Sequence, residues 1–140
     1  MTSPAKPDLL LQSDGSELYV DESESCNITN TLYDATGVAL ATASILTLTA
    51  TLKNASDGAI INSINGTDVL NAGKGVVADN ADGEAVLTLR LEPADNAVIT
   101  ETDTETLESH YLMLEWTWND GVASRTGRHW WEIRVQLSGA

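Results

Sequence analysis

The residue types that carry most enzyme and metal chemistry are scarce in this chain, which has two histidines and one cysteine among 140 residues. His110 follows Glu108 and Ser109, but side chains adjacent in a strand point to opposite faces, so these three do not form a triad. Two histidines and one cysteine also fall short of the four ligands of a structural zinc site. Cys26 has no partner for an intramolecular disulfide, and we expect it to be a half-buried strand residue. We therefore predict no catalytic residue, no metal and no cofactor.

Two polar segments resemble ligand loops but miss the required residues. In segment 79–84 (DNADGE), a calcium loop aligned on the glycine would need ligands at Ala78 and Leu89, whose side chains cannot coordinate calcium. Lys74 lies between two glycines, but a phosphate loop would need Ser or Thr where Gly75 stands. Both segments are predicted to be turns.

The closing stretch, residues 110–137, contains all four tryptophans in two apolar segments, HYLMLEWTW and HWWEIRVQL. In strand register, Trp116, Trp118 and Trp131 fall on the face predicted for the core. Trp130 falls on the opposite face. An outward-facing tryptophan is a frequent anchor at protein interfaces and in sugar sites.

Arg125 and Arg128 lie just before Trp130 and form the one basic spot that the sequence of this acidic chain suggests. We take these three residues as a candidate interface. The alternative is structural, with Trp130 covering a second sheet edge or packing under the preceding loop.

The net charge of −14, from 21 acidic and 7 basic residues, limits the classes of partner. Nucleic acid and anionic membrane surfaces need clustered Lys and Arg, so neither is expected as a partner. The charge favours solubility and repulsion between free copies, or docking onto something basic. The start of the chain has no apolar run of signal-peptide length, and no segment approaches the roughly 20 apolar residues of a membrane helix. We expect a protein that stays in the cytoplasm or in a particle assembled there.

Short apolar segments alternate with turn residues along the chain, and none keeps a helical period. The clearest alternation is in residues 43–52, where threonines separate the apolar positions. The positions predicted there to face the core are Leu46, Leu48, Ala50 and Leu52. About seven to nine such strands, with frequent turns between them, predict an all-β fold, an antiparallel two-sheet β-sandwich.

Two local signals refine this prediction. Asn65-Gly66 predicts a two-residue hairpin loop between extended segments at 59–64 and 69–70. Residues 93–97, which begin with a proline after a strand, predict one helical turn.

The first residues differ from the rest in having two prolines and little to bury before Leu9. We predict an extended N-terminal arm with an edge strand over residues 1–24, followed by a sandwich domain over residues 25–140. The apolar residues Leu9, Leu10 and Leu11 in the arm are candidates for contact with a neighbouring subunit.

Five segments between Cys26 and Leu137 carry a family resemblance: ITNTLYDATGVAL, ILTLTATLKN, LTLRLEPADNAVI, HYLMLEWTWNDG and HWWEIRVQL. In their order of strands and turns they resemble the immunoglobulin-like β-sandwich proteins of tailed bacteriophage virions. Tyr111 leads a strand after a proline turn and a polar loop, a position similar to the tyrosine corner of immunoglobulin-like folds. Met113 stands where the cysteine of that motif is usual, so no inter-sheet disulfide is implied.

The resemblance implies assembly in many copies, with an arm or an edge strand that pairs with a neighbour. We therefore expect a non-enzymatic virion structural protein, made in the bacterial host cytoplasm, that decorates the capsid or forms part of the head–tail neck. Its expected partners are other virion proteins and copies of itself. The alternative is a carbohydrate-binding or adhesive β-sandwich module that uses Trp130.

Overall fold

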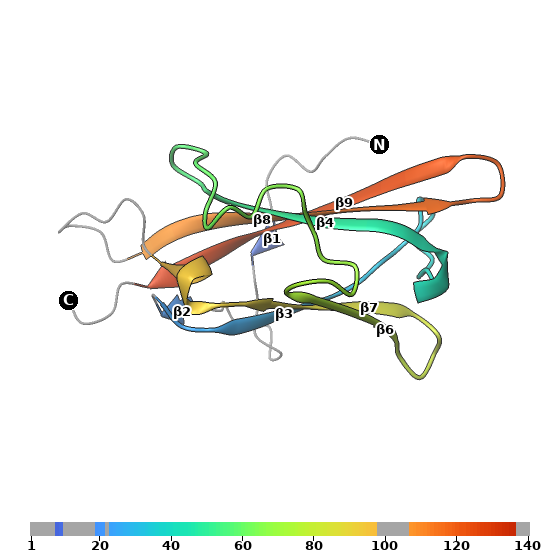
Figure 1. Cartoon of the computed structure of the whole chain (residues 1–140), viewed down its shortest axis with the longest axis horizontal. Helices are drawn as coiled ribbons and strands as arrows, with labels where there is room; N and C mark the ends of the chain where they lie inside the picture. Colours follow the sequence, from blue (N-terminus) through green and yellow to red (C-terminus); the bar gives the residue numbers. More distant parts are fainter. Residues whose placement is uncertain (1–7, 10–18, 22, 98–106, 137–140) are drawn as a thin grey trace.

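The computed structural model describes residues 8–9, 19–21, 23–97 and 107–136. Over these residues the chain consists of strands, connecting loops and two single-turn 3-10 helices, η1 (Thr42–Ser44) and η2 (Pro93–Asn96). The strands form two sheets that lie face to face (Figure 1). The predicted all-β, two-sheet sandwich is therefore confirmed.

The larger sheet has the strand order β1-β9-β8-β4-β5, and β2 also pairs with β9. Its strands are β1 (Asp8–Leu9), β2 (Tyr19–Asp21), β4 (Ile45–Asn54), β5 (Thr67–Asp68), β8 (Leu107–Asn119) and β9 (Ser124–Gln136). The neighbours among β5, β4, β8 and β9 are antiparallel, whereas β1 and β2 run parallel to β9.

The smaller sheet is antiparallel, with the order β3 (Cys26–Thr31), β7 (Ala85–Leu91) and β6 (Gly75–Asp79). In immunoglobulin domains the strands B, E and D share one sheet and C, F and G share the other. Here β3, β7 and β6 take the places of B, E and D, while β4, β8 and β9 take those of C, F and G. The strand order itself thus gives the immunoglobulin-like topology, with β2 added in parallel along the last strand.

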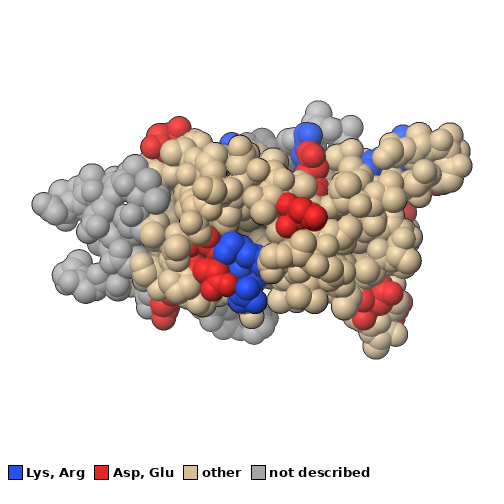
Figure 2. Space-filling view, in the orientation of Figure 1, with Lys and Arg blue, Asp and Glu red and all other residues tan. Residues whose placement is uncertain are grey.

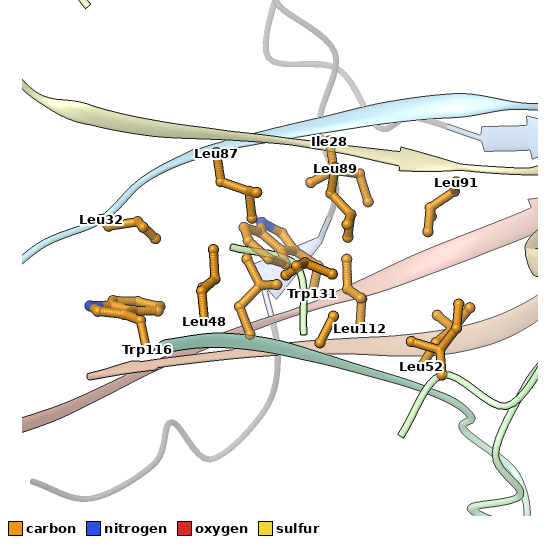
Figure 3. Close-up of a cluster of buried hydrophobic side chains, with 14 of the residues drawn as sticks. Ile28, Leu32, Leu48, Leu52, Leu87, Leu89, Leu91, Leu112, Trp116 and Trp131 are labelled. Atoms are coloured by element: carbon orange, nitrogen blue, oxygen red, sulfur yellow. The ribbon is translucent and has the colours of Figure 1, made fainter. Parts of the chain in front are cut away.

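The core lies between the sheets because alternate side chains of each strand point inward. Figure 3 shows leucines of the smaller sheet facing Leu48, Leu112, Trp116 and Trp131 of the larger one. The most exposed of these four side chains, Trp131, is only 7% exposed. Burial of a side chain of this kind stabilises the fold by about 1.5–3 kcal/mol. Packing between the sheets is thus the main stabilising contribution.

The inward and outward faces of the closing hairpin agree with the predicted register. Trp116, Trp118 and Trp131 are buried, and Trp130 lies on the outer face, half-buried. Leu137, also predicted to face inward, lies outside the described residues.

The alternation predicted in β4 is wrong at its first position. Leu46 is 53% exposed, while its neighbour Ile45 is buried. The pairing of β4 with β8 shifts register between Ile45 and Thr47, as in a β-bulge. Because of this shift, the side chain of Ile45, and not that of Leu46, points into the core.

The predicted hairpin around Asn65-Gly66 is also wrong. Gly66 has the positive φ of a turn, but the next residues form β5, which pairs with β4. Residues 59–64 form no strand, since Asn62 and Ser63 both have positive φ values, of 51° and 61°. Two such residues in succession bend the chain, so that Ile61 and Ile64, on either side of them, are both buried.

The predicted helical turn is confirmed as η2, and a buried carboxylate fixes it. Asp95 accepts hydrogen bonds from the Glu92 amide (2.7 Å) and from Asn62 Nδ2 (2.7 Å), and its Oδ2 lies 2.9 Å from Lys74 Nζ. These bonds connect three loops at one end of the sandwich. Asp95 is therefore a structural residue whose oxygens are already occupied by partners of the same chain.

Candidate functional site

The candidate interface residues of the N-terminal arm lie only partly within the described residues. Leu9 is in β1, where its Cα partner is Glu132 of β9, whereas Leu10 and Leu11 fall outside. β1 and β2 pair with β9 over two and three residues. Where it is described, the arm is therefore an edge of the chain's own larger sheet.

Arg125, Arg128 and Trp130 all lie in β9, but on two different faces of it. Arg128 and Trp130 share the outer face, while Arg125 is the register partner of Trp118, whose side chain is in the core. Arg125 Nε lies 2.6 Å from Asp120 Oδ2, and Arg128 is paired with Glu115. The structure thus separates the basic spot suggested by the sequence into two ion pairs.

Trp130 belongs to a group on the outer face that we call the outer-face strip: Lys53 of β4, Tyr111 and Met113 of β8, and Trp130 of β9. The Tyr111 and Trp130 rings meet edge to face, with 5.7 Å between their centroids and an interplanar angle of 78°. Lys53 Nζ lies 6.0 Å from the Trp130 centroid, at the outer limit of a cation–π contact. All four side chains are half-buried. The strip is thus an ordered aromatic surface that a partner could cover.

Polar pairs border the outer-face strip at both ends. The Arg128–Glu115 pair lies toward the tip of the hairpin. Toward the other end, Ser109 Oγ donates to Glu132 Oε2 (2.7 Å), and Arg134 Nε lies 3.5 Å from the same oxygen. An apolar centre with a polar rim is the usual composition of a protein–protein interface.

A second candidate site, which we call the hairpin pocket, opens between β9 and the segment that follows β3. Its volume is about 180 Å³. Its lining residues are Tyr33, Asp34, Ala35, Trp116, Trp118, Thr126, Gly127, Arg128 and His129. It lies at the end of the sandwich formed by the connection between β3 and β4 and by the β8–β9 turn. In antibody variable domains, the corresponding connections are at the antigen-binding end.

Trp116 and Gly127 shape the hairpin pocket. Trp116 Nε1 donates to the Tyr33 carbonyl at 3.0 Å, which fixes the loop against the hairpin. A Cβ atom on Gly127 would lie 2.7 Å from Trp116 Cε2, so only glycine leaves room for the indole ring. The sequence reasoning missed this pocket because Tyr33 and Trp116 are 83 residues apart. Gly127 within a strand was the available signal, since such a glycine often marks a close approach.

Asp34 holds the loop wall of the hairpin pocket in shape. Its Oδ1 accepts hydrogen bonds from the Thr36 hydroxyl (2.7 Å), the Thr36 amide (2.8 Å) and the Val38 amide (3.0 Å). These bonds, that of the Thr36 hydroxyl most of all, lower the pKa of Asp34 below its ordinary value. The carboxylate therefore stays ionised at neutral pH and is engaged in an Asx turn.

The other residues with reactive side chains, His110, Ser109 and Cys26, lie in surroundings that give them a structural role. His110 is fully buried, with Nε2 2.7 Å from Glu108 Oε2, while Ser109 points to the outer face, as predicted for adjacent strand residues. Cys26 is half-buried, and burial is the main cause that raises the pKa of its thiol, against the opposing effect of a hydrogen bond from Asn96. The thiol is thus protonated at neutral pH and is a poor nucleophile.

Two further kinds of site are absent from the described part of the chain. Among these residues, no group of three or more His, Cys, Asp or Glu side chains is placed to hold a metal ion. No helix there has the length and hydropathy needed to cross a membrane.

Comparison with known proteins assigns no family: no family model and no curated protein sequence matches the chain. The outer-face strip and the hairpin pocket are therefore the two features from which a function is inferred. Both lie on the β8–β9 hairpin, one on each face.

Proposed function

We propose that this chain is a non-enzymatic structural protein of a tailed-phage virion, which decorates the capsid or forms part of the head–tail neck. In this role it docks onto neighbouring virion proteins through the outer face of its larger sheet. The outer-face strip is the observation that carries the proposal. The resemblance in strand and turn order to phage immunoglobulin-like modules supports the virion setting.

The composition of the outer-face strip favours a protein partner. Aromatic residues and methionine are enriched in protein interfaces, and tryptophan and tyrosine supply many of the residues that dominate binding energy. Trp130 and Tyr111 are already held in place by each other, so a partner that covers them restricts little further side-chain motion. The strip therefore offers apolar contact at a low cost in conformational entropy.

The charge of the chain indicates what the partner surface should carry. A net charge of −14 makes free copies repel one another, so a partner with basic groups gains favourable electrostatics on docking. On the face seen in Figure 2, the largest group of Lys and Arg atoms lies beside Asp and Glu atoms, and acidic groups recur across the surface. Copies of the chain then come together in the particle because each is bound to a common basic neighbour.

The N-terminal arm is the second element of the proposal. β1 and β2 pair with β9 over only two and three residues, so exchanging them onto a neighbour's β9 would break few contacts. Residues 1–20 would then link copies in the particle by strand addition. Val20, which is buried, would have to refill the same position in the neighbouring copy.

Particles of the phage that encodes this chain provide the test. Mass spectrometry of purified particles is expected to find the chain in many copies. A phage carrying Trp130→Ala should assemble particles that hold about tenfold less of the chain, because the strip loses its central ring. The control is Val122→Ala at the exposed hairpin tip, which should leave occupancy unchanged. Absence of the chain from particles, or full occupancy by the Trp130 variant, would refute the proposal.

The hairpin pocket favours a second candidate, a carbohydrate-binding or adhesive module. Tyr33 is 45% exposed at the pocket, and an aromatic face beside polar groups suits a sugar ring. A glycan array should then show binding that Tyr33→Ala abolishes and Val122→Ala preserves. An array without signal for the wild-type chain excludes this candidate and leaves the virion proposal untouched.

A further inference from the structure

Part of the β9 edge carries no partner strand among the described residues. β9 pairs with β8 along its whole length, from Ser124 to Gln136. On its other side, β1 and β2 pair with residues 131–132 and 134–136 only. Within the described part of the chain, residues 124–128 have no strand on that side.

The register shows which backbone groups this open edge presents. The Asp120 amide donates to the Ala123 carbonyl at 3.2 Å and closes the hairpin turn. Hydrogen-bonded and non-hydrogen-bonded pairs alternate from there along an antiparallel ladder. The amides and carbonyls of Arg125 and Gly127 therefore point toward β8, whereas those of Thr126 and Arg128 point toward the open side.

The hairpin pocket lies directly beside this edge. Its β9 side is formed by residues 126–129, and Tyr33, Asp34 and Ala35 line it from the loop after β3. Side chains of an added strand would alternate between the two faces of the sheet. One that faces inward opposite Gly127 would enter the pocket, where the Trp116 indole lies against Gly127 and forms one wall.

We propose that residues 124–128 of β9 bind an extended peptide segment of another protein by strand addition, and that the hairpin pocket takes one large apolar side chain of this segment. An extended backbone is the ligand whose alternating amides and carbonyls match those of an open strand edge. The site would continue the pairing that β1 and β2 already make along the same side of β9. The net charge of −14 favours a neutral or basic segment over an acidic one.

The charged side chains of this segment do not shield the edge. Natural proteins often protect open edges with prolines or with charged side chains. Residues 124–128 contain no proline, and both arginines are held by acids of the same hairpin, Arg125 by Asp120 and Arg128 by Glu115. This binding does not require the partner to be a virion protein.

The test uses a library of displayed random seven-residue peptides, selected on the full chain. Two variants separate the edge from the pocket. Thr126→Pro removes one outward amide without removing a bond to β8, and Ala35→Phe fills the pocket. Their matched controls are Thr126→Val, which keeps the amide, and Ala81→Phe, which adds the same ring on an exposed turn of the smaller sheet.

Selected peptides are expected to contain one large apolar residue and to lose at least about tenfold in affinity for both test variants. Affinity for the two control variants, and for Trp130→Ala, should not change. If only Ala35→Phe lowers the affinity, the peptides bind the pocket without pairing with the edge. If only Thr126→Pro lowers it, they pair with the edge without using the pocket. If neither variant lowers it, the peptides bind elsewhere on the chain. Each of these results, or a selection that enriches no peptide, overturns the inference.

Hydrogen exchange on the wild-type chain tests the same site without a substitution that could unfold it. The Thr126 and Arg128 amides should exchange rapidly in the free protein and at least about tenfold more slowly with a selected peptide bound. The Gly127 amide should be protected in both states. Unchanged exchange at Thr126 and Arg128 in the complex would refute strand addition.

Discussion

Trp130 and Trp131 are neighbours in β9, yet their surroundings have little in common. Trp131 is 7% exposed and lies in the core between the sheets, where the His129 ring meets it edge to face at 4.5 Å. Trp130 is half-buried on the outer face, against Tyr111 and below Lys53. One face of the sheet thus uses its tryptophan for packing, while the other leaves it accessible to a partner. Alternation along a single strand is sufficient to place one tryptophan in the core and its neighbour on the surface.

The strongest test of this comparison is to remove each of the two rings in turn. Trp131→Ala should lower the free energy of unfolding by about 3–5 kcal/mol, because it removes a large buried side chain and leaves a cavity. Trp130→Ala should cost no more than about 1 kcal/mol, since its ring keeps contact with water and packs on the surface against side chains that include Tyr111 and Lys53. Urea denaturation of both variants measures the difference. Equal losses would mean that the outer face is as important for folding as the core.

A smaller effect is expected where the inner face reaches the hairpin tip. Gly127→Ala places a methyl group 2.7 Å from Trp116 Cε2, so the indole ring must move and its hydrogen bond to the Tyr33 carbonyl is strained. Overpacking of this kind costs about 1–3 kcal/mol. Thermal unfolding together with tryptophan fluorescence checks both the loss and the movement of the ring. Gly121→Ala, in the turn, is the control. Gly121 has a φ of 95° and open space where a Cβ atom would lie, so an alanine there introduces backbone strain without a clash.

Period-two alternation allowed much of this hairpin to be predicted from sequence. It placed Leu112, Leu114, Trp116 and Trp118 on one face of β8 and separated Trp130 from Trp131, because each assignment needs only a count along one strand. It failed at Leu46, where a register shift against β8 reverses the faces. Such a shift depends on the partner strand, and the local pattern does not contain it.

The pocket and the parallel edge are beyond local sequence patterns for the same reason. Tyr33 meets Trp116 only after the two sheets have packed, and the pairing of β2 with β9 joins residues from opposite ends of the chain. The grouping of Arg125 with Arg128 as one basic spot ignored their spacing of three residues. In a strand this spacing places them on opposite faces, and each has found its own acid.

The Arg128–Glu115 ion pair on the outer face should contribute less than Trp131 or the Gly127 contact. Arg128 and Glu115 are register partners, but their side chains are 51% and 34% exposed. Exposed pairs are typically worth about 0.2–1 kcal/mol. A double-mutant cycle with Arg128→Ala and Glu115→Ala, followed by urea denaturation, should give a coupling energy in that range which falls as salt is added. A larger, salt-independent coupling would mean that this rim is part of the folding core.

The smallest expected effect lies at the tip of the hairpin, where Asp120 holds the turn. Its Oδ1 accepts the amides of Val122 and Ala123, both at 2.9 Å, and its Oδ2 meets Arg125 Nε. The Ala123 amide first, and then Arg125, lower the pKa of Asp120 well below its ordinary value of about 3.9. Because the folded-state pKa is the lower one, this carboxylate stabilises the turn at pH values above about 3.9, and the contribution is lost as pH falls toward the folded pKa.

An NMR titration of the Asp120 carboxyl carbon should therefore show a midpoint below about 3.9. The Val122 and Ala123 amide signals should shift over the same range of pH, since both amides bond to this carboxylate. Asp120→Asn should remove the pH dependence of these two signals while the buried Trp131 remains in place, because the tip lies outside the core. If acid instead releases Trp131 together with the turn, the two ends of the hairpin fold as one unit. The buried part of the hairpin and its exposed tip would then unfold together, although their packing differs.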